Sequence, residues 1–116
     1  MIQSEITTIY SLERKFIIVK HIILWKLKSE FTAEQKAEAK AECKRRLENL
    51  NGKIPGMLSL SVIIDGCDSS NADMMLDSAF ETEEALAGYQ VNPLHQEAAG
   101  YVRSVVENRL CLDFHA

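Results

Sequence analysis

An apolar run near the N-terminus, IIVKHIILWKL over residues 17–27, constrains the fold more than any other segment. It is rich in Ile and Val and has apolar side chains at both odd and even positions, as a strand buried on both faces requires. The odd set, which contains His21, Ile23 and Trp25, is the more apolar of the two. The run is shorter than the roughly 20 residues of a membrane span. The sheet that holds this strand therefore needs a covering layer on each face.

The rest of the chain predicts three more strands, one helix after the first strand, and one or two helices before the last strand. Thr32 and Gln35 have the spacing of a capping box and open a run of good helix formers. Alternation of apolar and polar side chains with a period of two indicates the strands. Pro93 indicates the first residue of the last helix. The predicted elements are a helix over 33–50, strands over 57–64 and 72–80, helices over 83–89 and from residue 93 onward, and a strand over 110–115.

This order of elements is the split βαβ pattern of an α+β, ferredoxin-like fold. It predicts a four-stranded antiparallel sheet with its helices on one face. Because the helices cover one face only and the first strand is apolar on both, the second face needs a partner sheet, and a homodimer would supply it. We expect residues 17–116 to form the single domain and residues 1–16 to be an N-terminal extension.

Charge and cysteine content exclude several classes of function. Thirteen Lys and Arg against seventeen Asp and Glu give a net charge of -4, which argues against a nucleic-acid partner. Cys43, Cys67 and Cys111 have no CxxC or Cys/His ligand spacing, which argues against a disulfide framework and a structural zinc site. The odd number of cysteines, with no signal peptide or membrane span indicated, leads us to expect a cytoplasmic protein with no membrane partner. We also expect no metal, because no ligand spacing is present, and no cofactor.

Four segments occur along the chain in an informative order: VKHIILWKL in the first strand, KIPGM before the second, FETEEALAGYQVNPLH ahead of the last helix, and CLDF in the last strand. In combination they make the chain similar to the stress-responsive dimeric α/β-barrel family, over about residues 18–115. The resemblance implies a ferredoxin-like subunit that pairs sheet to sheet into a barrel-shaped dimer. It also implies that the first strand turns its odd face toward the helices.

The resemblance further implies two catalytic candidates. In a plant polyketide cyclase of this family, a Tyr and a His that flank the turn before the last helix carry out an aldol condensation without metal or organic cofactor. Tyr89 and His95 occupy the matching positions, although Asn92 stands where the family often has His before Pro. The helix macrodipole would keep His95 neutral, so that it could accept a proton while Tyr89 holds a carbonyl oxygen. The alternative is a structural His95 that caps its helix or fills the core.

We expect a pocket between sheet and helices that binds a small hydrophobic or aromatic molecule. Besides Tyr89 and His95, its expected lining is His21, Ile23, Trp25, Leu60, Met74 and Leu76. Three functions stay open: a cofactor-independent, cyclase-like or lyase-like acid–base catalyst acting on a carbonyl compound, a binding module with the same pocket, and a purely structural stress-response homodimer whose interior is filled. An open cavity that touches both Tyr89 and His95 would argue against the third.

Overall fold

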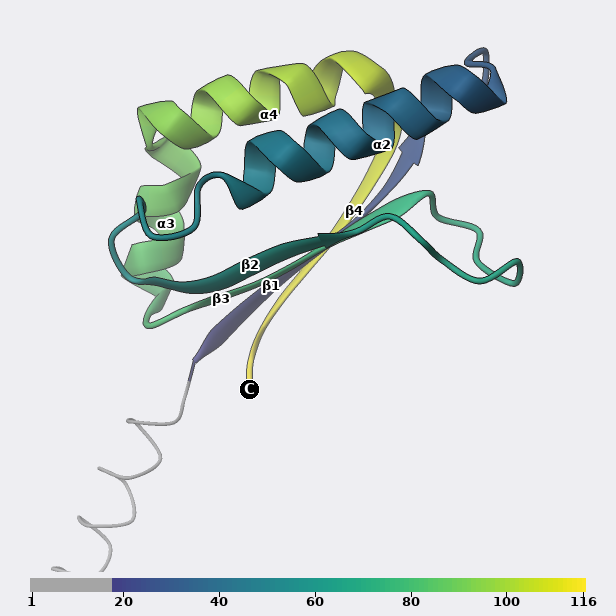
Figure 1. The fold of residues 1–116 in the computed structure, drawn as a ribbon. Helices are drawn as coiled ribbons and strands as arrows, with labels where there is room; N and C mark the ends of the chain where they lie inside the picture. The colour runs from purple at the N-terminus through teal and green to yellow at the C-terminus, as the bar shows by residue number, and fades with distance from the viewer. Residues whose placement is uncertain (1–17) are drawn as a thin grey trace, which may run out of the picture.

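A computed structural model describes residues 18–116, which form a four-stranded antiparallel sheet with three helices on one face (Figure 1). The strands are β1 (Val19–Leu27), β2 (Met57–Ile63), β3 (Met74–Phe80) and β4 (Val106–His115), in the spatial order β2-β3-β1-β4. The helices are α2 (Ala33–Glu48), α3 (Glu83–Val91) and α4 (Pro93–Val105). The α+β, ferredoxin-like prediction is confirmed. The predicted extension over residues 1–16 lies outside the described residues.

The helices begin where their capping residues stand. The Thr32 side chain accepts a hydrogen bond from the Gln35 backbone, and the Gln35 side chain accepts one from the Thr32 backbone, which completes the predicted capping box of α2. The Thr82 side chain accepts a hydrogen bond from the Ala85 backbone and caps α3, and the Asn92 side chain accepts one from the Leu94 backbone and caps α4. None of the described helices is both long and apolar enough to cross a membrane.

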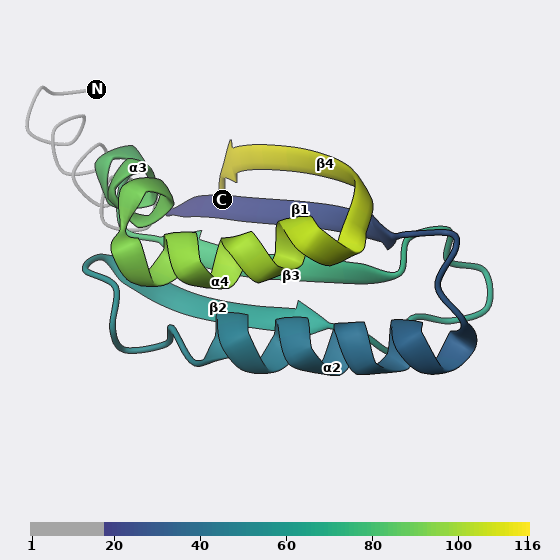
Figure 2. The same cartoon turned by 90° about the horizontal axis from the view of Figure 1, so that it is seen from above.

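The odd face of β1 lies against the helices and forms the centre of the core. His21, Ile23 and Trp25 are all at least 95% buried there, together with the inward stripe of α2. Seen from above, α2 and α4 lie over the β2 side and the middle of the sheet, whereas β4 runs along the edge beside them (Figure 2). The helix-side face of β4 is therefore only partly covered.

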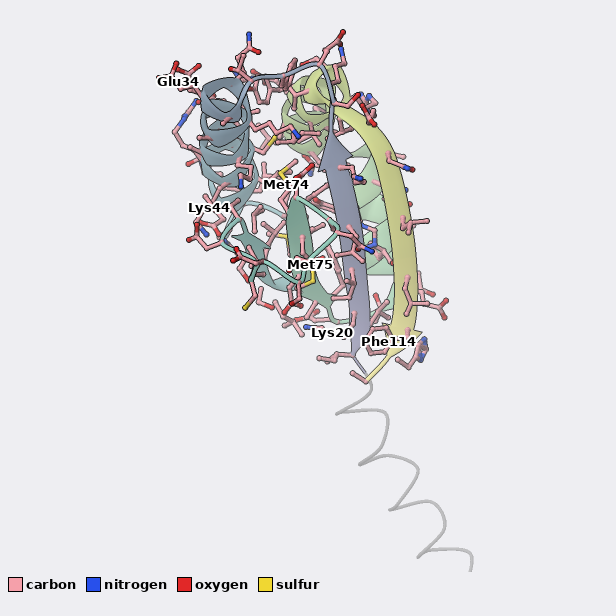
Figure 3. All side chains as sticks on the ribbon, turned by 90° about the vertical axis from the view of Figure 1, so that its right-hand side faces the viewer. Lys20, Glu34, Lys44, Met74, Met75 and Phe114 are labelled. Atoms are coloured by element: carbon pink, nitrogen blue, oxygen red, sulfur yellow. The ribbon has the colours of Figure 1, made fainter. Side chains whose placement is uncertain are left out.

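The even face of β1 points away from the helices and joins an apolar surface. The register pairs Ile22 with Leu112 and Leu24 with Leu110, so these side chains share one face of the sheet. Leu110 and Leu112 are 69% and 65% exposed in the single chain. Phe114, labelled in Figure 3, extends the same face at the end of β4. We call this side of the sheet, with its exposed residues Leu24, Leu110, Leu112 and Phe114, the open sheet face.

Two details of the strands differ from the predictions. The period-two alternation over residues 57–64 predicts that Leu58 shares the face of Leu60 and Val62. The register of β2 shifts between Met57 and Ser59, and Leu58 is exposed. β4 begins at Val106, four residues before the predicted start, and Val106 belongs to this strand and not to the preceding helix.

Candidate functional site

A cavity of about 190 Å³ lies between the sheet and helices α3 and α4, with Leu47 of α2 as part of its wall. Most of its lining is apolar. Its ionisable side chains are His21 from β1, Tyr89 from α3, His95 and Arg103 from α4, and Arg109 from β4. The cavity touches both Tyr89 and His95.

The structure brings six of the eight predicted site residues to this cavity: His21, Ile23, Trp25, Leu76, Tyr89 and His95. Leu60 and Met74 do not line it. Both are buried in the hydrophobic core (Met74 is labelled in Figure 3). Leu60 belongs to β2, which packs against α2, whereas the cavity lies toward β1 and β4.

Tyr89 and His95 meet across the tight connection between α3 and α4. Only Asn92 separates the two helices, and its extended backbone lets the chain change direction there. Tyr89 therefore lies in the last turn of α3 and His95 in the first turn of α4, with ring centroids 4.0 Å apart and ring planes inclined by 37°. The pairing places a phenol and an imidazole on one wall of the cavity.

The phenol ring of Tyr89 is held firmly in the core. It is 1% exposed and packs against Phe80, with ring centroids 5.0 Å apart, and against His21 at 6.2 Å. Burial raises the pKa of Tyr89 well above its usual range, so the hydroxyl keeps its proton at neutral pH. Tyr89 also lines the cavity, so this side chain is within reach of a bound molecule.

The surroundings of His95 lower its pKa and favour the neutral imidazole. Burial is the first cause that lowers its pKa, and the positive charges of Arg103 and Arg109 add to the lowering, while a backbone contact to Gln90 opposes it. Nδ1 lies 3.4 Å from the Gln90 carbonyl oxygen, which can only accept, so Nδ1 carries the proton and Nε2 keeps its lone pair.

His21 is held by a residue that the sequence analysis missed. Its Nδ1 lies 2.5 Å from Oδ1 of Asp113, and only 2% of the His21 side chain is exposed. Arg109, which lies opposite Trp25 in the register, was missed as well. The period of two along a strand predicts that Arg109 and Asp113 share one face of the last strand. Which residues of β1 lie opposite them depends on the register between the two strands, and this register cannot be predicted from the sequence.

The cavity therefore combines an apolar chamber with three complementary groups. Tyr89 can donate a hydrogen bond, His95 can accept a proton, and the guanidinium of Arg109 can offset negative charge that develops on a bound molecule. Proton abstraction next to a carbonyl group uses groups of these three kinds.

Residues 19–116 match the model of a protein family described as Stress responsive A/B Barrel Domain. The match covers nearly the whole described chain, including Tyr89, His95 and all four strands. No curated protein sequence is significantly similar to the chain.

Solved structures share the fold. A dimeric ferredoxin-like protein from Bacteroides fragilis is 26% identical, with a TM-score of 0.80, over 85% of this chain and 96% of that one. A protein from Arabidopsis thaliana is 25% identical, with a TM-score of 0.64, over 83% and 92% of the two chains. A hydroxynitrile lyase from Passiflora edulis is 19% identical, with a TM-score of 0.66, over 87% and 94%, which shows a common fold only.

Proposed function

Because the chain belongs to the stress-responsive A/B barrel family, we propose that it binds a small aromatic or apolar carbonyl compound and acts on it by cofactor-free acid–base chemistry. The observation that carries this proposal is the pairing of a neutral imidazole with a protonated phenol on one wall of an apolar cavity. Catalysis of this kind needs a proton acceptor whose pKa lies near or below the working pH.

The proposed reaction begins with removal of a proton from the carbon next to the carbonyl group. Nε2 of His95 accepts this proton, and the electron pair of the C–H bond moves toward the carbonyl oxygen. The Tyr89 hydroxyl donates a hydrogen bond to that oxygen, and Arg109 offsets part of the negative charge. The imidazolium then returns its proton to the product, so that the enzyme is unchanged. In an intramolecular condensation the enolate carbon first attacks a second carbonyl carbon, the C=O electron pair moves to that oxygen, and the imidazolium protonates the resulting alkoxide. A lyase reaction runs these steps in reverse: His95 takes the hydroxyl proton, the C–C bond breaks, and the released carbanion is protonated.

Cavity size limits the substrate. About 190 Å³ is less than the roughly 300–1,000 Å³ of pockets that take drug-sized ligands. One ring with a short side chain fits this space better than a long chain. His21, Ile23, Trp25 and Leu76 would form the walls around it, while the Leu60 and Met74 of the sequence prediction would act only through packing behind them.

The fold neighbours support the proposal in a limited way. One solved structure with this architecture is named a hydroxynitrile lyase, so lyase activity occurs on such a scaffold. Another is named a putative antibiotic biosynthesis monooxygenase, from Nitrosomonas europaea. Both are less than 25% identical to this chain, so they indicate the type of scaffold and not the substrate.

The proposal includes a homodimer formed through the open sheet face. Similar structures from three bacteria are described as dimeric. In the single chain this face exposes Leu24, Leu110, Leu112 and Phe114 together, which is more contiguous apolar surface than a monomer usually leaves to water. A second sheet would cover it.

Hydrogen–deuterium exchange on a small carbonyl probe tests the chemistry directly. We expect the protein to accelerate exchange of the α-protons of an aryl ketone such as acetophenone in D₂O, followed by NMR. His95→Gln should abolish the acceleration, and His115→Gln, which changes an exposed histidine outside the cavity, should not. Binding without exchange would leave a binding module, and neither binding nor exchange across a panel of such probes would favour the structural homodimer.

A further inference from the structure

Three side chains with metal-binding atoms meet on the helix side of β1 and β4. The register places His21 opposite Asp113, and Cys111 lies two residues before Asp113 on the same face. The Cys111 Sγ is 3.4 Å from Oδ1 of Asp113 and 3.7 Å from Nδ1 of His21, and all three atoms lie within 4.8 Å of one another. Cys111 takes no part in the function proposed above.

These separations match the edges of a tetrahedral metal site. Zinc holds sulfur at about 2.3 Å and nitrogen or carboxylate oxygen at about 2.0–2.2 Å, so neighbouring ligand atoms lie roughly 3.3–3.8 Å apart. Both sulfur distances fall in this range. Only the 2.5 Å hydrogen bond between His21 and Asp113 is too short. The Asp113 side chain is 39% exposed and has room to turn, whereas the buried His21 ring is fixed in place.

We propose that His21, Cys111 and Asp113 bind one divalent transition-metal ion of the zinc type, with water in the fourth position. A thiolate, a carboxylate and a neutral imidazole suit such an ion in charge and in softness, and three protein ligands with one open position are typical of zinc sites that react or exchange ligands. Metal binding replaces the His21–Asp113 hydrogen bond and the thiol proton of Cys111. Burial and Asp113 raise the pKa of the Cys111 thiol and so oppose its deprotonation, whereas the positive charge of Arg109 favours the thiolate but repels the ion.

This inference goes beyond the proposed acid–base function, which does not need the ion. It also departs from the sequence expectation of no metal. Spacing rules find ligands that are near each other in the sequence, whereas His21 and Cys111 are 90 positions apart and meet only through the pairing of β1 with β4. Because His21 also lines the cavity, the ion would lie at the edge of the chamber.

Cobalt(II) titration of the tag-free full chain, kept reduced with a phosphine, tests the proposal. Thiolate ligation to Co²⁺ produces an intense charge-transfer band in the near-ultraviolet, which carboxylate or imidazole ligands alone do not give. We expect this band to saturate at one ion per chain and to disappear when Zn²⁺ is added. Absence of the band in the folded wild-type protein would overturn the proposal.

Matched variants identify the ligands. Cys111→Ser should abolish the band, and Asp113→Asn should weaken cobalt binding by about 100-fold or more, since loss of even an outer-shell partner costs 10–100-fold. Both side chains are exposed enough for the fold to tolerate the changes, which circular dichroism checks. Cys67→Ser, at the other exposed cysteine, should leave the titration unchanged. Loss of the band in Cys67→Ser, or its persistence in Cys111→Ser, would show that the assigned ligand is wrong.

Discussion

The imidazole of His95 lies against the phenol ring of Tyr89, with ring centroids 4.0 Å apart, although the two residues belong to different helices. Tyr89 is buried and His95 is half-buried, and in both cases the loss of solvent favours the uncharged form: the neutral base for His95 and the protonated acid for Tyr89. Groups whose pKa values are pushed apart in this way can divide the roles of proton acceptor and hydrogen-bond donor at neutral pH.

We expect His95 to make the protein less stable as the pH falls. Its pKa in the folded protein lies below the unfolded value of about 6.5, so the unfolded chain takes up the proton first. The contribution to the free energy of unfolding is fully present above the unfolded pKa and is lost as the pH falls toward the folded pKa. Urea unfolding of wild type and His95→Gln, between about pH 8 and about pH 5, measures it as a difference between the two proteins.

NMR titration provides the direct control for this prediction. The His95 resonances should titrate below the reference value of about 6.5, with the exposed His115 as the internal comparison. A His95 that titrates at or above the reference value would make it a structural cap and would remove it from the proposed mechanism.

Tyr89→Phe should separate the role of the hydroxyl from that of the ring. The variant keeps the packing against Phe80, so we expect the free energy of unfolding to change by less than about 1 kcal/mol, whereas Tyr89→Ala should cost about 3–5 kcal/mol. Affinity for a carbonyl probe should fall about tenfold in Tyr89→Phe, the worth of one hydrogen bond. Urea unfolding measures the change in stability, and calorimetric titration with the probe measures the change in affinity. Unchanged affinity in Tyr89→Phe would remove Tyr89 from ligand recognition.

The fold could be predicted because its local signals agree with its packing. The capping box at Thr32 and the Asn-Pro start of α4 mark helix ends by hydrogen bonds within a few residues, and the period-two alternation marks the buried faces of the strands. The start of β4 was placed too late because Val105 and Val106 continue the apolar face of α4 and are equally suited to a strand.

The candidate site was predictable only where it is local in sequence. Tyr89 and His95 flank one short connection, so a motif contains both, whereas Asp113 reaches His21 from 92 positions away through the β1–β4 register. Strand alternation placed Leu60 on the correct face of the sheet but could not tell which helix covers it. The odd or even position of a residue along its strand determines the face of the sheet on which it lies. The packing of the helices on that face determines where a cavity remains.

Charge on the open sheet face should dissociate the proposed homodimer. Leu112→Arg places a guanidinium at a position that pairs with Ile22 across β1 and β4, where a partner sheet would bury it without a counter-charge. We expect a monomer in sedimentation velocity at micromolar concentration, against twice the chain mass for wild type. Val91→Arg, at a residue of α3 that is 74% exposed and away from this face, is the matched control and should remain dimeric. A wild-type chain that already sediments as a monomer would contradict the dimer.

Gly56 should tolerate alanine much less well than Gly52, although both have a positive φ, of 76° and 80°. An added Cβ at Gly52 has no neighbour within 4 Å, so Gly52→Ala costs only the left-handed backbone, about 1–2 kcal/mol. At Gly56 the added Cβ would lie 2.6 Å from the Cβ of Ala85, a short side chain that cannot move without its helix α3. Because α3 carries Tyr89, we expect Gly56→Ala to lose more than about 3 kcal/mol of unfolding free energy and to weaken probe binding in the cavity. Urea unfolding of both variants measures the difference, and equal losses would mean that α3 shifts freely and does not hold Tyr89 in place.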